Sequence, residues 1–206
     1  MNYCSNCGAA IQKKTPPGDN RLRFVCDICN IVHYQNPKIV AGCIPEWEGR
    51  ILLCRRAIIP RYGLWTLPGG FMENDETVLE AALRETLEEA NASVEISELF
   101  TLFNLPYVNQ VYLMFRARLL DLNYHPGQES LEVDLFEESQ IPWDQLAFST
   151  IHHTLRFYFN DRRAGNFGFH MGDIVKLGDR THFMERRPNP LEDPISVEQR
   201  NYSIDS

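Results

Sequence analysis

The stretch GGFMENDETVLEAALRETLEEAN, residues 69–91, decides how this chain folds. Thr77 and Glu80 form a T-x-x-E capping box, which marks the start of a helix, and Asn91 tolerates the left-handed backbone of a helix end. The spacing therefore predicts a helix over residues 77–90. Its expected buried stripe follows the helical period and comprises Leu79, Ala82, Leu83, Thr86, Leu87 and Ala90.

Three carboxylates crowd the C-terminal half of this predicted helix. Glu85, Glu88 and Glu89 lie at i, i+3 and i+4, where like charges repel and the helix dipole disfavours anions. A solvated acidic face is the ordinary interpretation of an acidic helix, but it leaves this clustering unexplained. Mg²⁺ or Mn²⁺ explains it, because hard cations prefer oxygen ligands and cancel the repulsion.

The residues around the carboxylates fit the same interpretation. Gly69 and Gly70 let the backbone come close to a metal or a phosphate, and a carbonyl of this turn is a candidate further ligand. Arg84 precedes Glu85 in the sequence. It forms either a surface ion pair or a bidentate contact that holds a catalytic carboxylate in one rotamer.

Two tight cysteine pairs stand near the N-terminus with the spacing C-x2-C-x18-C-x2-C, namely Cys4, Cys7, Cys26 and Cys29. Four thiolates on two short turns suit a tetrahedral structural zinc ion. Gly8 and Asn30 follow the pairs, and both accept the left-handed backbone that such turns use. We expect a zinc ribbon over residues 1–34, with the metal supplying folding energy. Disulfides, a redox-active pair and an iron site of rubredoxin type are the alternatives.

The rest of the chain mixes strand-like and helix-like segments without regular alternation, which favours an α/β or α+β sandwich. Expected strands cover residues 38–44, 50–55, 94–103, 110–119 and 131–136, and further helices cover 142–147 and 149–163, the last with a hydroxyl start and Gly165 as its cap. We predict a main domain over residues 37–164. Residues 165–206 form a C-terminal extension that is partly loose, with three prolines between 186 and 194.

Composition excludes several classes of protein. The 206 residues include 28 acidic and 20 basic side chains, a formal charge of −8, so a broad nucleic-acid-binding face is not expected. No apolar run reaches the roughly 18–20 residues that cross a bilayer, and the N-terminus lacks the pattern of a secretory signal. We expect a cytoplasmic protein without a membrane partner. The oligomeric state is open, and a homodimer is compatible with the sequence.

The acidic stretch resembles a known family motif. Gly70, Glu76, Arg84, Glu85, Glu88 and Glu89 match the Nudix box G-x5-E-x7-R-E-U-x-E-E-x-G-U, where U is aliphatic. Thr86 replaces an aliphatic residue and Asn91 replaces the final glycine. The run GLWTLPGG at 63–70 also resembles the family's lead-in. The likeness covers about residues 38–160, and the N-terminal segment resembles the zinc ribbon found before some Nudix domains, including NADH and ADP-ribose/FAD pyrophosphatases.

This resemblance implies an α/β/α sandwich that hydrolyses a nucleoside diphosphate linked to another moiety. It implies that Mg²⁺ or Mn²⁺ binds the carboxylates of Glu85, Glu88 and Glu89 with the carbonyl of Gly69. Arg84 would orient Glu85, and Glu76 would support the loop before the helix. A further ligand or general base in this family often comes from a later loop, for which Glu129 is the first candidate and Glu132 the second.

Substrate identity follows less directly. Arg55, Arg56 and Arg61 flank the lead-in and are candidates for phosphate binding, although solvated arginines are the ordinary interpretation for at least one of them. Tyr62 is a candidate for stacking on a base. NADH-cleaving relatives carry S-Q-P-W-P-F-P-x-S after the box, and residues 105–110 here do not match it.

We therefore expect a dinucleotide or nucleotide-sugar substrate, first ADP-ribose or FAD, with release of AMP. An NADH pyrophosphatase and a non-catalytic nucleotide-sensing or binding module are the alternatives.

Overall fold

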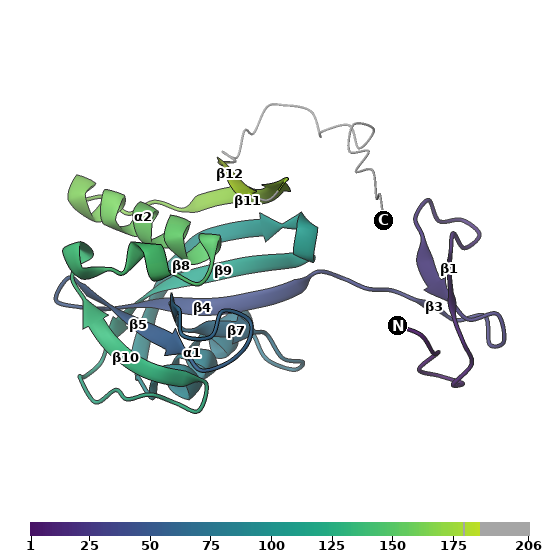
Figure 1. Cartoon of the computed structure of the whole chain (residues 1–206), viewed down its shortest axis with the longest axis horizontal. Coiled ribbons are helices and arrows are strands. Elements are labelled where there is room, and N and C mark those ends of the chain that lie inside the picture. The colour runs from purple at the N-terminus through teal and green to yellow at the C-terminus, as the bar shows by residue number, and fades with distance from the viewer. Residues whose placement is uncertain (179, 186–206) are drawn as a thin grey trace.

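The computed structural model describes residues 1–178 and 180–185, so the proline-rich segment 186–194 and the end of the chain lie outside the described residues. The N-terminal part is a small antiparallel sheet of β1 (Gln12–Lys14), β2 (Arg23–Val25) and β3 (Val32–His33). Gly8 and Asn30 have φ of 73° and 59°, which confirms the left-handed turns expected after the cysteine pairs. An extended segment leads from this ribbon into the main domain (Figure 1).

The main domain is built on one large mixed sheet. Within the described residues its strands run in the order β10-β5-β4-β9-β8-β11-β12, and two short strands pair beside this path, β6 with β5 and β7 with β4. Neighbours are antiparallel except β4 with β9 and β8 with β11, which are parallel. The strands are β4 (Lys38–Trp47), β5 (Arg50–Arg56), β6 (Trp65–Thr66), β7 (Gly69–Phe71), β8 (Val94–Leu105), β9 (Gln110–Leu119), β10 (Ser130–Phe136), β11 (His170–Leu177) and β12 (Arg180–Glu185).

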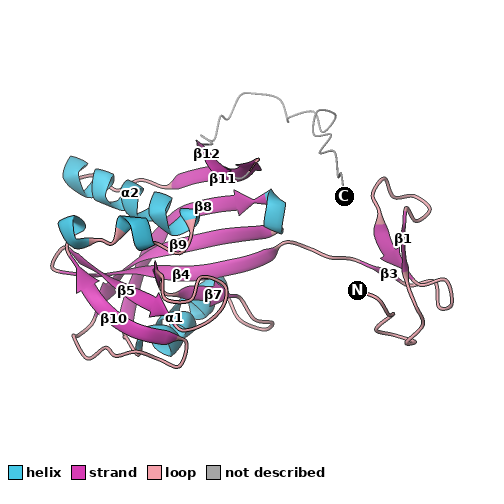
Figure 2. Ribbon diagram, in the orientation of Figure 1, coloured by secondary structure: helices cyan, strands magenta, loops and turns pink. Residues whose placement is uncertain are grey.

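Two helices, α1 (Val78–Ala90) and α2 (Ser149–Ala164), lie on opposite sides of the strands (Figures 1 and 2). The period-2 alternation of a strand explains this arrangement, because successive side chains of β5 point to opposite faces. Leu52 and Cys54 belong to the core beneath α1, whereas Ile51 and Leu53 belong to the core beneath α2. The expected α/β/α sandwich is confirmed.

Helix α1 begins and ends as expected. Thr77 caps it through the complete capping box, and Asn91 has φ of 47° with its backbone N–H donating to the carbonyl of Leu87. Its predicted buried face is wrong in part: Leu79, Leu83 and Leu87 are exposed. The residues buried in α1 are Ala81, Ala82, Thr86, Glu89 and Ala90.

The physical reason is the close approach of α1 to the sheet. Cys43 of β4 reaches the carbonyl of Ala82, with 3.6 Å between Sγ and the oxygen, which only small helix residues permit. The helix consequently turns its leucines outward and points Glu89 inward.

The sequence predicts a C-terminal extension over residues 165–206, whereas the structure places most of residues 165–185 in the sheet. Strand β11 pairs with β8, and β12 forms the edge. Ile174 is fully buried against Phe103 and Leu105. Apolar and polar residues do not alternate clearly in this segment, so the sequence alone does not indicate a strand. Its place in the sheet depends on pairing with β8, some seventy residues earlier in the chain.

Two smaller expectations also differ. The segment 142–147 forms only a short 3₁₀ turn, η3 (Trp143–Gln145), because its end pairs with the backbone of Trp65 instead of continuing a helix. Helix α2 is capped by Phe148 without a side-chain bond, so the expected hydroxyl cap is absent, while Gly165 closes it with φ of 68° as predicted. Two more 3₁₀ turns are η1 (Pro106–Val108) and η2 (Glu138–Gln140).

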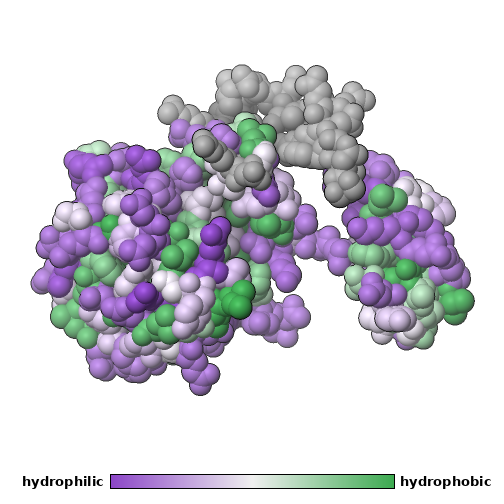
Figure 3. Space-filling view, viewed as in Figure 1, coloured by the Kyte–Doolittle hydropathy of each residue, from purple (hydrophilic) through white to green (hydrophobic). Residues whose placement is uncertain are grey.

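The face seen in Figure 3 is mostly polar, with apolar residues in small separate groups on both the main domain and the ribbon. Neither α-helix of the described part is long and apolar enough to cross a bilayer.

Candidate active site and metal centre

A cleft of about 1330 Å³ opens between α1, the turn before β7, and the loops that follow β5, β8 and β9. Its lining combines three kinds of group: carboxylates, arginines and aromatic rings. The carboxylates are those of Glu85, Glu88 and Glu89, which the sequence singled out, together with Glu129 and Glu73. One cleft therefore brings the predicted acidic cluster and its later-loop candidate together.

Glu89 is the most buried member of the cluster, with 6% of its surface exposed. The backbone N–H of Gly69 donates to its Oε2 at 3.3 Å. Burial above all, together with the nearby charges of Glu85 and Glu129, raises the pKa of Glu89 to about 8. A buried carboxylate facing two others is costly as an anion unless a cation compensates it. This donor set fits a hard divalent ion.

Glu85 and Glu88 differ in exposure. Glu85 is half-buried, and burial is the main cause that raises its pKa. Glu88 is exposed, and its side chain accepts a hydrogen bond from Arg84 at 2.9 Å. The cluster thus runs from a buried carboxylate to a solvent-facing one along a single helix face.

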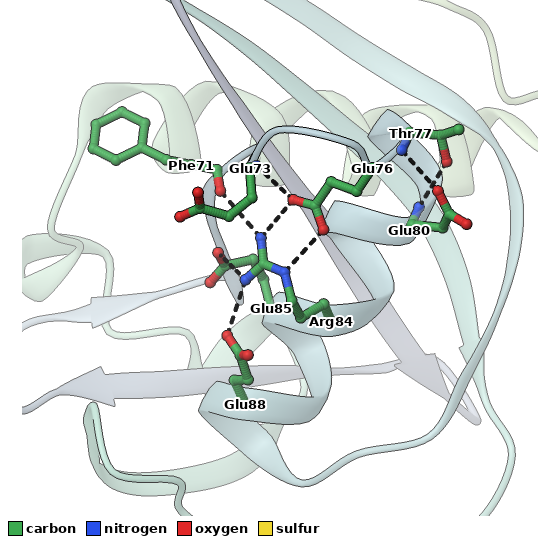
Figure 4. A network of polar contacts seen from close by, with 8 residues as sticks. All are labelled: Phe71, Glu73, Glu76, Thr77, Glu80, Arg84, Glu85 and Glu88. Carbon is green, nitrogen blue, oxygen red and sulfur yellow. Dashed lines mark hydrogen bonds and ion pairs between the residues drawn. The ribbon is translucent and has the colours of Figure 1, made fainter.

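Arg84 is the centre of the network in Figure 4. Its Nε and Nη2 donate to the two oxygens of Glu76 at 3.0 and 2.7 Å, and its Nη1 donates to Glu85 at 2.8 Å. It also contacts the carbonyl of Phe71 at 3.1 Å. The sequence predicts a bidentate contact between Arg84 and Glu85, but the structure shows it between Arg84 and Glu76, and Glu85 accepts a single bond. The reason is that Glu76 lies on the loop before the helix, where it meets the Nε and Nη2 edge of the guanidinium.

Glu76 ties the loop to the helix. Besides the two bonds from Arg84, it accepts a bond from the backbone N–H of Glu73 at 2.6 Å. These bonds lower the pKa of Glu76 to about 2, and those from Arg84 contribute most. Glu76 stays charged at neutral pH and holds Arg84 in place.

Gly70 allows the turn and the helix to meet. A Cβ at Gly70 would lie 2.5 Å from the carboxyl group of Glu85, well inside contact distance. Gly70 does not have a positive φ, so a side chain at this position would act through space, by displacing the Glu85 carboxyl group.

Glu129 comes to the cleft from the loop before β10. Its backbone carbonyl accepts a bond from Ala57 at 2.8 Å, and its exposed side chain lies close enough to raise the pKa of Glu85 and Glu89. Glu132 does not line the cleft; it contacts Arg55 at 3.4 Å.

The candidate substrate-binding residues divide into two groups. Arg61 lines the cleft, and so does Arg56. Arg55 does not, because its Nε donates to the carbonyl of Gly63 and its Nη1 meets Glu132. Tyr62 is largely exposed outside the lining. The alternation of β5 explains the split, since neighbouring arginines point to opposite faces.

Sequence reasoning missed the aromatic part of the lining, which consists of Phe71, Tyr107, Tyr112 and Phe148. Phe71 and Tyr112 flank Val40 in register on β7, β4 and β9, so their side chains share one face of the sheet. Phe71 follows the glycine pair directly, which was an available signal. Tyr112 belongs to this face only through a strand pairing that the sequence does not display.

The four cysteines of the ribbon form a second cluster. The Sγ atoms of Cys4 and Cys29 lie 3.6 Å apart, those of Cys7 and Cys26 lie 3.5 Å apart, and all four lie within 4.8 Å of one another. A tetrahedral zinc site with bonds of about 2.3 Å has sulfur–sulfur separations of about 3.8 Å, so the cluster fits such an ion. His33, which the sequence did not single out, lies 3.3 Å from Cys4 Sγ through its Nε2 and is placed to support that ligand.

Family models account for both parts of the chain. Residues 2–35 match the model described as Nudix N-terminal, and residues 36–156 match the NUDIX domain. The second match covers more than half of the chain, so the chain belongs to the Nudix family: it is a Nudix hydrolase with an N-terminal zinc ribbon, of the class that cleaves phosphoric anhydride bonds.

Among solved structures, a NUDIX hydrolase from Nitrosomonas europaea is 55% identical, with a TM-score of 0.83 over 85% of this chain and 100% of that one. An archaeal ADP-ribose pyrophosphatase from Methanocaldococcus jannaschii is 29% identical over 56% of this chain and 69% of its own length. A human mitochondrial NAD(P)H pyrophosphatase is 30% identical over 68% of this chain, but the match spans only 38% of its length.

Proposed function

We propose that this protein hydrolyses the pyrophosphate bond of a nucleoside diphosphate linked to another moiety, with ADP-ribose or FAD as first candidates and AMP as a product. The observation that carries the proposal is the meeting of five carboxylates and three arginines in one cleft. Carboxylates alone would repel an anionic substrate, and arginines alone would bind it without activating water. The likeness to the ADP-ribose pyrophosphatase of Methanocaldococcus jannaschii supports the choice of substrate.

Glu85, Glu88 and Glu89, with the carbonyl of Gly69, would hold Mg²⁺ or Mn²⁺. When bound, such ions shield phosphate charge and lower the pKa of water. Arg84 keeps Glu85 and Glu88 oriented through its anchor on Glu76. The residues of one network thus preorganise the cluster before substrate arrives.

The remaining cleft residues bind substrate and move the proton. Arg56 and Arg61 contact the phosphates, and the aromatic lining holds the nucleoside. Glu129 accepts the proton of the attacking water. The water oxygen bonds to one phosphorus, and the bond from that phosphorus to the bridging oxygen breaks. The bridging oxygen stays with the other phosphate as the leaving group, so AMP and a second phosphorylated product are released separately.

The test is release of AMP from ADP-ribose, FAD and NADH with Mg²⁺ or Mn²⁺. Glu89→Gln is expected to lower kcat/KM by more than about 100-fold, since changes outside a ligand shell already cost about 10- to 100-fold. Glu95→Gln is the matched control, because Glu95 lies on β8 outside the cleft. Equal turnover by wild type and Glu89→Gln, or none by either, would refute the proposal, and cleavage of NADH alone would select the alternative substrate.

We also propose that the cysteine cluster of the ribbon holds one structural zinc ion. Four thiolates would leave no open position for catalysis, and a sheet of three short strands has little core of its own. The metal would then supply most of the folding free energy of this unit.

A further inference from the structure

The loop over residues 120–129 is fastened to the C-terminal end of α1. His125 donates its backbone N–H to the carbonyl of Ala90 at 2.9 Å, and Gly127 donates to the carbonyl of Glu89 at 3.0 Å. These carbonyls are among the four that a helix end leaves without partners. The loop therefore closes the same helix turn that carries the acidic cluster.

Gly127 sets how closely the loop approaches. A Cβ at this position would lie 1.7 Å from the carbonyl oxygen of Glu88, so only glycine fits. Two residues later the loop presents Glu129, whose carbonyl is fixed by Ala57. The position of the Glu129 carboxylate thus depends on contacts with both α1 and the end of β5.

Asn91 adds a side-chain bond to this junction. Its Nδ2 donates to the carbonyl of His125 at 3.2 Å, while its backbone takes the left-handed conformation with φ of 47°. Glycine, which the box motif places here, would supply the conformation but no donor. The Asn91 side chain therefore contributes a hydrogen bond to the loop that the left-handed backbone conformation alone does not provide.

We propose that Asn91 is a positioning residue, which fixes the loop over residues 120–129 so that Glu129 faces the carboxylates of α1. The functional half of this inference rests on the role proposed above for Glu129; the structural half, the tether itself, does not. Asn91 also lines the cleft, so the test must separate positioning from direct contact with substrate.

The decisive variant is Asn91→Gly, which keeps the left-handed backbone and removes the amide. Asn109→Gly is its matched control, because Asn109 also has a positive φ, of 53°, and lies outside the lining of the active-site cleft. The control reports the general entropic effect of glycine. Both variants are made in the full chain with the ribbon intact.

The first readout is amide hydrogen exchange without substrate or added divalent ion. In Asn91→Gly, the amides of His125 and Gly127 are expected to exchange roughly fivefold faster, the factor associated with one net hydrogen bond, and those within α1 are expected to stay unchanged. Asn109→Gly is expected to match wild type in this loop. Unchanged exchange in Asn91→Gly would overturn the tether.

The second readout is the dissociation constant of Mn²⁺ alone, compared for wild type, Asn91→Gly and Glu129→Gln. We expect both variants to bind Mn²⁺ several-fold more weakly. If Glu129→Gln weakens binding and Asn91→Gly does not, the positioning role is refuted. If Glu129→Gln binds as wild type does, the Glu129 carboxylate does not face the metal-binding carboxylates of α1, and the functional half of the inference fails.

Discussion

The carboxylate of Glu89 shows how position changes the chemistry of one residue. Glu88 and Glu89 are neighbours in the sequence, yet the first is exposed and the second is almost fully buried. Burial raises the pKa of Glu89 to about 8, so without a cation the folded protein favours its protonated form at pH 7. Binding of a divalent ion should therefore release a proton from this cluster.

The stability of the chain without added Mg²⁺ or Mn²⁺ is expected to fall as the pH rises. The pKa of Glu89 in the folded protein lies above the ordinary glutamate value of 4.5, so between these two values the folded state holds more protons than the unfolded state. Linkage then makes the free energy of unfolding decrease through this window. Glu89→Gln removes this dependence, and denaturant unfolding at pH 5 and pH 8.5 measures the difference. Parallel pH profiles for both proteins would contradict the assignment.

Arg84→Lys tests the network of Figure 4. Lysine keeps the charge but cannot make the bidentate contact with Glu76 together with the bond to Glu85. We expect kcat to fall by about 10- to 100-fold with a smaller change in KM, because the arginines proposed to bind the phosphates are Arg56 and Arg61. Arg118→Lys, on an exposed pair with Glu95, is the control. A loss confined to KM would assign Arg84 to substrate binding instead.

At the scale of the elements, α1 illustrates the limit of periodicity. The 3.6-residue period located the helix and its caps correctly, but it assigned the leucines to the buried face. Leu79, Leu83 and Leu87 are 46%, 40% and 53% exposed. The hydrophobic pattern predicted the wrong buried face because the helix packs so close to the sheet that only small residues fit between them. The same orientation of α1 points Glu89 toward the cleft.

Truncation of a leucine distinguishes the two faces. Leu83→Ala on α1 is expected to lower the free energy of unfolding by less than about 1 kcal/mol, whereas Leu52→Ala on β5, which is fully buried, is expected to cost about 2–5 kcal/mol. Denaturant unfolding of both variants checks this. A large loss for Leu83→Ala would indicate that a partner covers the outer face of α1.

At the scale of the molecule, the ribbon and the sandwich have separate cores. The buried clusters of the main domain contain no residue before position 41. The ribbon has instead the four thiols and a few buried residues around them. Two units with separate cores are expected to respond independently to a local change.

Cys26→Ser is expected to abolish the binding of about one zinc ion per chain and to loosen residues 1–34. Backbone amide spectra should then show ribbon signals collapsing while those of the main domain persist. Elemental analysis of the wild type identifies the metal. Iron with a red colour would replace the zinc assignment, and unfolding of the whole chain would show that the two units are coupled.

The sequence by itself determined the features that depend on local spacing. These features are the capping box, the left-handed positions, the location of most strands along the chain, the cysteine pairs and the clustering of Glu85, Glu88 and Glu89. Each follows from residues close to one another in the sequence. Such patterns are readable because helices and strands repeat with fixed periods. The family resemblance rests on this same local stretch.

Only the tertiary structure decided which side chains share the cleft. Alternation along β5 sends the adjacent Arg55 and Arg56 to opposite faces, but only the packing of the sheet places Arg56 in the cleft and Arg55 beside Glu132. The burial of Glu89, the aromatic lining and the place of β11 likewise depend on contacts between distant residues. The reason is physical: periodicity sets the direction of a side chain relative to its own element, whereas the packing of elements sets what that direction meets.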